Sequence, residues 1–271
     1  MGDGLLPLHF VSLGSIVPHE EVDDRRATRL AEELVRDGVL RNPPLVALDG
    51  ERHILLDGAT RAEALRRLGS AHTVVQEVTD PADALLETWH HVITGIEPTL
   101  LLDAMAATER VRLDPVTGDA EAHAVEYGGL CSVVTADGRS FVAFPEPGAN
   151  RFDALDAFAH AYTGAGIVSR TLETDLDILL ATYPRLAALV EFPQFTVEQV
   201  LVAASVGSLL PAGVTRFIVP GRVLRLDISL ELLLADSPLA EKNRWLRGHL
   251  AEKERLGRIR YYREPVYLLD E

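Results

Sequence analysis

The strongest constraint on the fold is a strand, turn and helix pattern within residues 45–69. Two short apolar runs, 45–48 and 54–56, flank Asp49-Gly50, an arrangement typical of a β-hairpin. The second run leads through Asp57-Gly58 into a stretch whose apolar residues recur at helical spacing. A hairpin that continues directly into a helix indicates helices packed on sheets, so we expect an α+β fold.

The same patterns predict further elements along the chain. We expect a helix over 27–35 that ends at Gly38, and a hairpin around Asp137-Gly138. Strands are expected at 5–11 and 74–78, helices at 81–91, 101–112, 151–162, 172–183 and 196–206, and extended pieces at 214–228 and 259–270 with a charged helix between them. Because 271 residues exceed the usual size of one domain, we expect two, residues 1–95 and 96–271, the second also α+β.

Composition excludes several classes of protein. No stretch approaches the ~20 unbroken apolar residues of a membrane span, and the N-terminus lacks the features of a secretion signal. Cys131 is the only cysteine, so neither an internal disulfide nor a cysteine metal cage can form, and we expect a cytoplasmic protein. The net charge of −15 argues against nucleic acid as a partner, because binding to phosphates needs a concentrated basic face.

The turn at Asp57-Gly58 has two interpretations on local grounds. A glycine turn into a helix N-terminus is a natural phosphate cradle, and Arg61 adds a positive charge. Alternatively the turn is structural, because Thr60 and Glu63 have the spacing of a capping box in which Thr60 caps the helix.

Three other clusters are each weak evidence by themselves. Glu20 and Glu21 precede the first helix, where a carboxylate can act as a base or simply complement the helix dipole. The segment 88–91 combines a tryptophan with two histidines, which on a helix would point about 100° apart and so would rarely share a metal ion. The segment 211–217 combines a glycine turn with a threonine and an arginine, which could hold a carboxylate or a phosphate.

The order of these clusters along the chain resembles the free L-serine kinase family, and in particular its siderophore-pathway branch. The pattern is an acidic His-Glu entry to the first helix, D-G-x-x-R, T-W-x-H and then P-x-G-x-T-R-F, with further likeness at 211–233 and 260–271. The resemblance implies a ParB/sulfiredoxin-like N-terminal domain and a second α+β domain. It also implies transfer of a phosphoryl group from ATP or ADP, with Mg²⁺, to L-serine.

The resemblance assigns roles residue by residue. Glu20 matches the catalytic glutamate, and the turn of Asp57, Gly58, Ala59, Thr60 and Arg61 matches the segment that contacts nucleotide phosphates, with Asp57 also catalytic and near the metal. Trp89, His91, Thr215 and Arg216 match positions near the amino-acid pocket, and Arg216 suits the serine carboxylate.

One departure separates this chain from the family pattern. Members typically carry one or two histidines between the glycine and the arginine of the turn, where this chain has Ala59 and Thr60. A hydroxyl can donate a hydrogen bond to a phosphate but carries no charge. Three alternatives therefore stay open: threonine or a related substrate, a ParB-like regulator that binds nucleotide or DNA, and a kinase relative that binds nucleotide without turnover.

Overall fold

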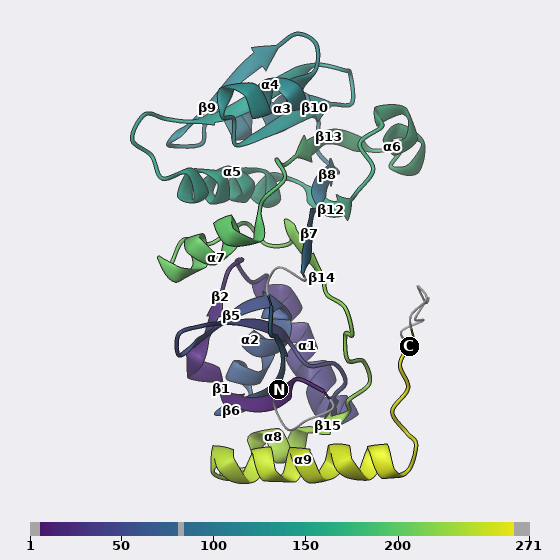
Figure 1. The fold of residues 1–271 in the computed structure, drawn as a ribbon. Coiled ribbons are helices and arrows are strands. Elements are labelled where there is room, and N and C mark those ends of the chain that lie inside the picture. Colours follow the sequence, from purple (N-terminus) through teal and green to yellow (C-terminus); the bar gives the residue numbers. More distant parts are fainter. Residues whose placement is uncertain (1–5, 81–83, 263–271) are drawn as a thin grey trace.

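The computed structural model describes residues 6–80 and 84–262, which form two bodies of sheet and helix, one above the other in Figure 1. The lower body contains a five-stranded sheet with strand order β1-β6-β4-β5-β2. Its strands are β1 (Leu8–Ser12), β2 (Ile16–Pro18), β4 (Leu45–Asp49), β5 (Arg52–Asp57) and β6 (His72–Val78), and a 3₁₀ turn, Leu13–Ser15, joins the first two. Helices α1 (Asp24–Asp37) and α2 (Ala59–Arg67) pack against each other beside this sheet.

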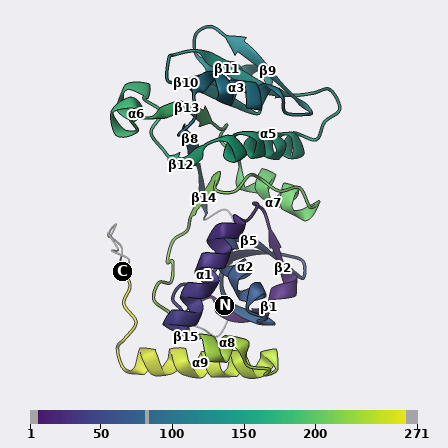
Figure 2. The same ribbon diagram turned by 180° about the vertical axis from the view of Figure 1, so that it is seen from behind.

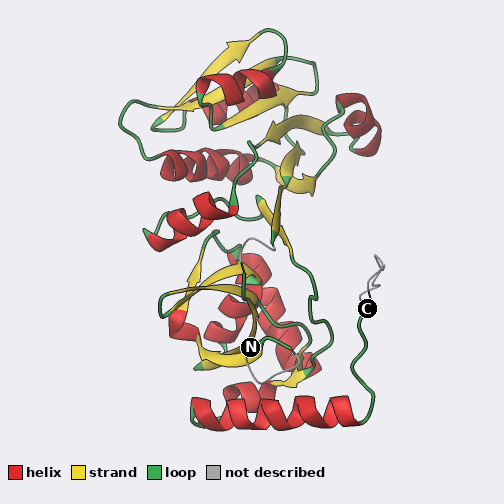
Figure 3. Cartoon of the chain, in the orientation of Figure 1, coloured by secondary structure: helices red, strands yellow, loops and turns green. Residues whose placement is uncertain are grey.

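The upper body is built on an antiparallel six-stranded sheet with strand order β12-β8-β13-β10-β11-β9. Its strands are β8 (His90–Thr94), β9 (Val111–Val116), β10 (Cys131–Thr135), β11 (Ser140–Pro145), β12 (Ile167–Thr171) and β13 (Leu186–Glu191). Its helices are α3 (Pro98–Ala106), α4 (Ala120–Tyr127), α5 (Arg151–Ala165), α6 (Leu176–Thr182) and α7 (Val197–Ser205). Figure 3 shows α5 and α7 at the side of this body that faces the lower one.

The chain then returns to the lower body. Strand β14 (Thr215–Ile218) pairs with β7 (Leu85–Thr88) in the narrow connection between the bodies, visible from behind in Figure 2. Strand β15 (Ile228–Ser229) pairs with β3 (Val39–Leu40), and helices α8 (Leu230–Leu234) and α9 (Leu239–Arg255) cover the base of the lower body. Residues from the N-terminal and C-terminal parts of the chain are therefore brought together where the two bodies meet.

The two faces of the lower sheet belong to different cores. Val46 and Leu55 pack with α1, α2 and the C-terminal residues Leu233 and Leu246, whereas Ala47 and Leu56 belong to the core that extends into the upper body. This split follows from the alternation of side chains along a strand. Because the lower sheet is buried on both faces, the two bodies are held together by apolar packing as well as by chain connections.

Most of the expected elements are present. The helix that ends at Gly38, the hairpin between β4 and β5, and the hairpin around Asp137-Gly138 are confirmed, and Gly38 has the left-handed φ of 70° expected of a helix C-terminus. The α+β class is likewise confirmed. Within the described residues no helix is long and apolar enough to cross a membrane.

Two predictions of helices were wrong. Of the segment expected as a helix over 81–91, residues 81–83 lie outside the described residues, and the rest contains strand β7 and the start of β8, because distant strands supply hydrogen-bond partners that no local pattern reveals. The helix expected over 101–112 spans Pro98–Ala106 instead, and its expected last residues lie in β9. The charged C-terminal helix is α9, while most of the extended piece expected at 259–270 lies outside the described residues.

The division into residues 1–95 and 96–271 remains a prediction, but the packing adds a feature that the sequence analysis did not include. Leu226, Ile228, Leu230, Leu233 and Leu246 share the apolar core of the N-terminal sheet. Residues 226–246 therefore pack with the N-terminal sheet rather than with the six-stranded sheet of the upper body.

Candidate active site

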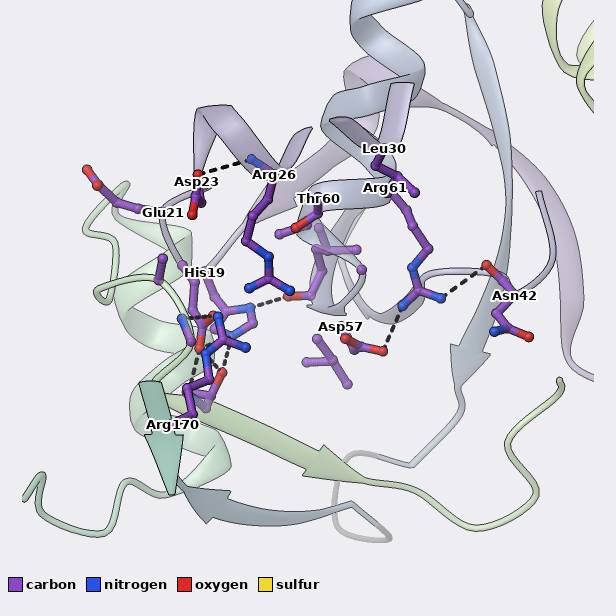
Figure 4. Close-up of a pocket in the computed structure, with 18 of the residues that line it drawn as sticks. His19, Glu21, Asp23, Arg26, Leu30, Asn42, Asp57, Thr60, Arg61 and Arg170 are labelled. Atoms are coloured by element: carbon purple, nitrogen blue, oxygen red, sulfur yellow. Dashed lines mark hydrogen bonds and ion pairs between the residues drawn. The ribbon is translucent and has the colours of Figure 1, made fainter. Parts of the chain in front are cut away.

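A cavity of about 670 Å³ lies where the two bodies meet (Figure 4). Its walls come from the loop between β2 and α1, the first half of α1, the turn from β5 into α2, and residues 212–215 before and at the start of β14. Arg170, on β12 of the upper body, completes the wall. Among the sequence candidates, Glu20, the five residues of the 57–61 turn and Thr215 all line this cavity.

Glu20 is held in the cavity wall by the chain that precedes β14. Its Oε2 accepts a hydrogen bond from the Gly213 N–H at 2.8 Å, and its Oε1 accepts one from the Thr215 N–H at 2.6 Å. The Thr215 hydroxyl also donates to Oε1. Two further backbone bonds join the segments, from the Leu210 N–H to the His19 carbonyl at 2.8 Å and from the Glu21 N–H to the Leu210 carbonyl at 2.9 Å.

The surroundings keep the Glu20 carboxylate ionised. Burial by itself would raise its pKa, but His19, the Thr215 hydroxyl and the Gly213 N–H hold the pKa below the ordinary value of 4.5. Only the ionised form can accept a proton, so the residue is in the state that a general base requires at neutral pH.

His19 links the two sides of this wall. Its Nδ1 bonds the Leu55 carbonyl, which can only accept, so Nδ1 carries a proton. Its Nε2 lies 2.7 Å from the Thr215 Oγ1 and 3.7 Å from the Glu20 Oε1. The ring is 4% exposed and packs edge-on against Phe217. His19 therefore fixes Thr215 and, through it, the orientation of the Glu20 carboxylate.

The turn from β5 into α2 forms the opposite part of the cavity. Gly58 has a left-handed φ of 99°, and a Cβ there would lie 2.9 Å from the Arg61 guanidinium, so this position favours glycine on both counts. The expectation that Thr60 caps the helix was wrong: Gly58 is the N-cap, no side chain makes a cap bond, and α2 already begins at Ala59. The first N–H groups of α2 therefore have no capping side chain and are available to an anion.

Asp57 and Arg61 are bound to each other and to other residues. The Asp57 Oδ2 accepts from the Arg61 Nη2 at 2.8 Å and also from Arg222. Burial would raise the pKa of Asp57, but the two guanidinium groups keep it below its usual range. Arg61 also donates to the carbonyls of Asn42 and Pro43, at 3.1 and 3.3 Å. Arg61 thus ties the turn to the loop at 42–43, and its contact with nucleotide phosphates remains a prediction.

The candidates for the amino-acid pocket are divided by the structure. Thr215 faces the cavity, but the next residue, Arg216, lies on the other side of β14, as alternation along a strand requires. Arg216 is exposed, pairs with the Glu87 carboxylate at 3.0 Å, and lies 5.1 Å above the centre of the Trp89 ring. Neither Trp89, His91 nor Arg216 lines the cavity, so their assigned roles remain predictions.

His91 is a buried neutral imidazole on β8. Its Nδ1 lies 2.8 Å from the Tyr162 hydroxyl, and its Nε2 has no hydrogen-bond partner among the described residues. Burial, with a smaller effect from the charge of Arg170, lowers its pKa to about 4. Because 88–91 spans two strands rather than a helix, the geometric argument made for adjacent histidines on a helix does not apply.

The sequence analysis gave no role to four residues of this site. His19 directly precedes Glu20 and Gly213 lies two residues before Thr215, so their closeness in sequence to predicted site residues could have indicated them. Arg222 and Arg170 had none, because they reach the site from a loop and from a strand of the other body.

No protein-family model matches the chain. The chain is 26% identical over 269 residues to the ATP-dependent L-serine kinase SbnI of Staphylococcus aureus, a match that covers 97% of each protein. The resemblance to free L-serine kinases is therefore confirmed.

Solved structures share the fold. A C-terminally truncated SbnI from Staphylococcus aureus superposes with a TM-score of 0.72 at 24% identity, covering 92% of this chain and 97% of that one. A free serine kinase in complex with AMP gives a TM-score of 0.69 at 16% identity, covering 86% of this chain and 98% of the other. The arrangement of both bodies is thus common to this chain and these kinases.

Proposed function

We propose that this protein is a free L-serine kinase that transfers the terminal phosphoryl group of ATP to the serine hydroxyl, giving O-phospho-L-serine. The observation that carries the proposal is the ionised Glu20 carboxylate in the wall of a cavity that also contains the open N-terminus of α2. A base and an anion site within one cavity are what transfer of a phosphoryl group to an alcohol requires.

Glu20 acts as the general base in this reaction. The serine hydroxyl oxygen bonds to the γ-phosphorus, the bond from that phosphorus to the β–γ bridging oxygen breaks, and the hydroxyl proton passes to the Glu20 carboxylate. ADP leaves with the bridging oxygen. Because the carboxylate is already held by Gly213 and Thr215, it needs no reorientation when the hydroxyl arrives.

The β5–α2 turn would bind the nucleotide phosphates. The first N–H groups of α2 and the positive end of its dipole favour anions, and Gly58 lets the backbone approach closely. Here Ala59 and Thr60 offer backbone N–H groups and one hydroxyl in place of the family's histidines.

Mg²⁺ fits this end of the cavity through Asp57. Both arginines bind its Oδ2, while Oδ1 has no hydrogen bond among the described residues, and Asp57 lines the cavity beside the N-terminus of α2. One carboxylate oxygen together with substrate phosphates is a usual ligand set for Mg²⁺. When bound, the ion would neutralise negative charge on the phosphate oxygens.

The likeness to free serine kinases also supports four broader proposals, on the two domains, the location and the pathway. The N-terminal sheet with α1 and α2 is a ParB/sulfiredoxin-like domain, and the remaining α+β part, residues 96–271, helps to form the amino-acid pocket. The protein acts in the cytoplasm, and its product supplies a siderophore or another specialised-metabolite pathway. The α9 region carries mixed charges and the whole chain is acidic, which favours small molecules over nucleic acid as partners.

Incubation of the protein with Mg²⁺, L-serine and either ATP or ADP tests the proposal, with O-phosphoserine measured by mass spectrometry. We expect phosphoserine with ATP, and little phosphothreonine when L-threonine replaces serine. Tight nucleotide binding without phosphoserine from either donor would overturn the proposal in favour of a non-catalytic binding protein. A shift of DNA at physiological salt would instead support a ParB-like regulator.

A further inference from the structure

Two arginines that line the cavity have neither a role in the reaction described so far nor an ion pair among the described residues. Arg26 lies in the first turns of α1, and Arg170 comes from β12 of the upper body. Figure 4 shows both side chains directed toward the same part of the cavity, beside His19, with Arg26 between His19 and Thr60. Both residues therefore line the same cavity as Glu20 and the N-terminal residues of α2.

Neither guanidinium group is neutralised by the protein. Within residues 6–80 and 84–262, no hydrogen bond or ion pair involves the side chain of Arg26 or Arg170. By contrast, Arg61 and Arg222 both bind the Asp57 carboxylate, and Arg29 lies 3.9 Å from the Glu33 carboxylate. Both residues are exposed to solvent as well as lining the cavity, so an anion that enters the cavity can reach their charges.

The Arg170 guanidinium packs against the backbone of Gly213. A Cβ at Gly213 would lie 2.0 Å from the Arg170 guanidinium carbon, so the guanidinium occupies the space that any side chain at position 213 would need. Gly213 also has a left-handed φ of 79° and donates its N–H to Glu20. The same glycine thus places both the base and a cation at one point of the cavity.

The two cations influence each other across the cavity. Burial lowers the pKa of the Arg170 guanidinium, the charge of Arg26 lowers it further, and the charge of Glu20 opposes this effect. Like charges that repel in the empty cavity are stabilised when an anion lies between them.

We propose that Arg26 and Arg170 bind the terminal phosphoryl group of ATP and hold it in front of Glu20. The inference rests on the proposed function. In that reaction the terminal group must lie between the hydroxyl at Glu20 and the other phosphates at α2, within the cavity that both arginines line.

Charge favours the phosphoryl group over the serine carboxylate. The terminal phosphate of ATP carries about two negative charges near neutral pH, which two guanidinium groups match. Free serine carries an ammonium group next to its carboxylate, and two cations would repel it. Planar guanidinium groups also bind phosphate oxygens in pairs, a geometry that lysine cannot reproduce.

The test measures affinities without serine, for AMP, ADP and a non-hydrolysable ATP analogue, by titration calorimetry with Mg²⁺. The variants are Arg26→Gln and Arg170→Gln, with Arg26→Lys as a milder change and Arg36→Gln as a control on the same helix, because Arg36 is exposed near the end of α1 and does not line the cavity. Loss of a hydrogen-bonded charge contact should weaken analogue binding about 10- to 100-fold in each Gln variant. AMP and ADP binding should change less than about 3-fold, and Arg36→Gln should bind all three as the wild type does.

The outcomes separate the inference from the proposed function. Equal losses for AMP, ADP and the analogue, or unchanged analogue binding, would overturn the inference. Unchanged nucleotide binding with a raised KM for serine would assign the arginines to the amino-acid carboxylate instead, and would also overturn it. The proposed function fails separately if the wild-type protein forms no phosphoserine although it binds AMP, ADP and the ATP analogue and the variants show the expected loss of analogue binding.

Discussion

Glu20→Gln tests the chemistry at the centre of the site, because it removes the proton acceptor with little change in shape. The Gln carbonyl oxygen can still accept from the N–H and the hydroxyl of Thr215. Its amide nitrogen, however, would face the Gly213 N–H across the 2.8 Å now spanned by a hydrogen bond. The substitution therefore removes a base and places two donors against each other.

The structure sets the expected size of both effects. Loss of a positioned general base lowers kcat by about 10²- to 10⁴-fold, which corresponds to about 3–5 kcal/mol in the activation barrier. The unsatisfied Gly213 N–H costs about 1–3 kcal/mol of unfolding free energy. Nucleotide affinity should change by less than about 3-fold, because Glu20 binds the acceptor end of the reaction and not the phosphates.

The assay combines steady-state formation of phosphoserine, nucleotide titration and urea unfolding. Glu32→Gln is the matched control, since Glu32 is exposed on α1 and should leave all three measurements unchanged. A Glu20→Gln enzyme that retains more than about a tenth of the wild-type kcat would refute the role of the carboxylate as base. A large loss of nucleotide affinity would show that Glu20 acts in binding.

Three further predictions concern the surroundings of the base. Burial and the nearby Glu21 raise the pKa of Asp156 to about 6 from an unfolded value of 3.8, so the folded state loses stability as pH rises through 6. Asp156→Asn should therefore stabilise the protein by about 1–3 kcal/mol at pH 8 and by little at pH 4, as thermal unfolding at the two pH values would show. Gly213→Ala should displace the Arg170 guanidinium and strain the backbone, lowering kcat at least about 10-fold with about 1–2 kcal/mol of lost stability, measured by kinetics and unfolding. Thr215→Val keeps the backbone N–H bond but removes the hydroxyl donor, so kcat should fall about 10-fold. Because the hydroxyl favours the ionised carboxylate, the acid limb of the pH profile of kcat should move to higher pH. An unchanged profile would contradict the role given to the hydroxyl.

Local patterns predicted the elements whose stability is decided locally. Gly38 ends α1 because its left-handed conformation suits glycine, and the hairpin at Asp49-Gly50 forms between strands that are adjacent in sequence. The segment 81–91 was assigned wrongly because β7 and β8 are stabilised by partners 73 or more residues away. Thr60 was assigned as a cap because the spacing was right, although Gly58 had already begun the helix turn.

The sequence alone determined which residues could do chemistry: the glutamate before α1, the glycine turn into α2, and the threonine and arginine near β14. Their order along the chain was enough to indicate a serine kinase. Only the tertiary structure decided which of these residues meet. Thr215 and Gly213 hold Glu20 across more than 190 positions of sequence, while Arg216 turns away and Arg170 arrives from the other body. The physical reason is that strand alternation and packing between the two bodies, rather than residue type, determine which side chains face the cavity.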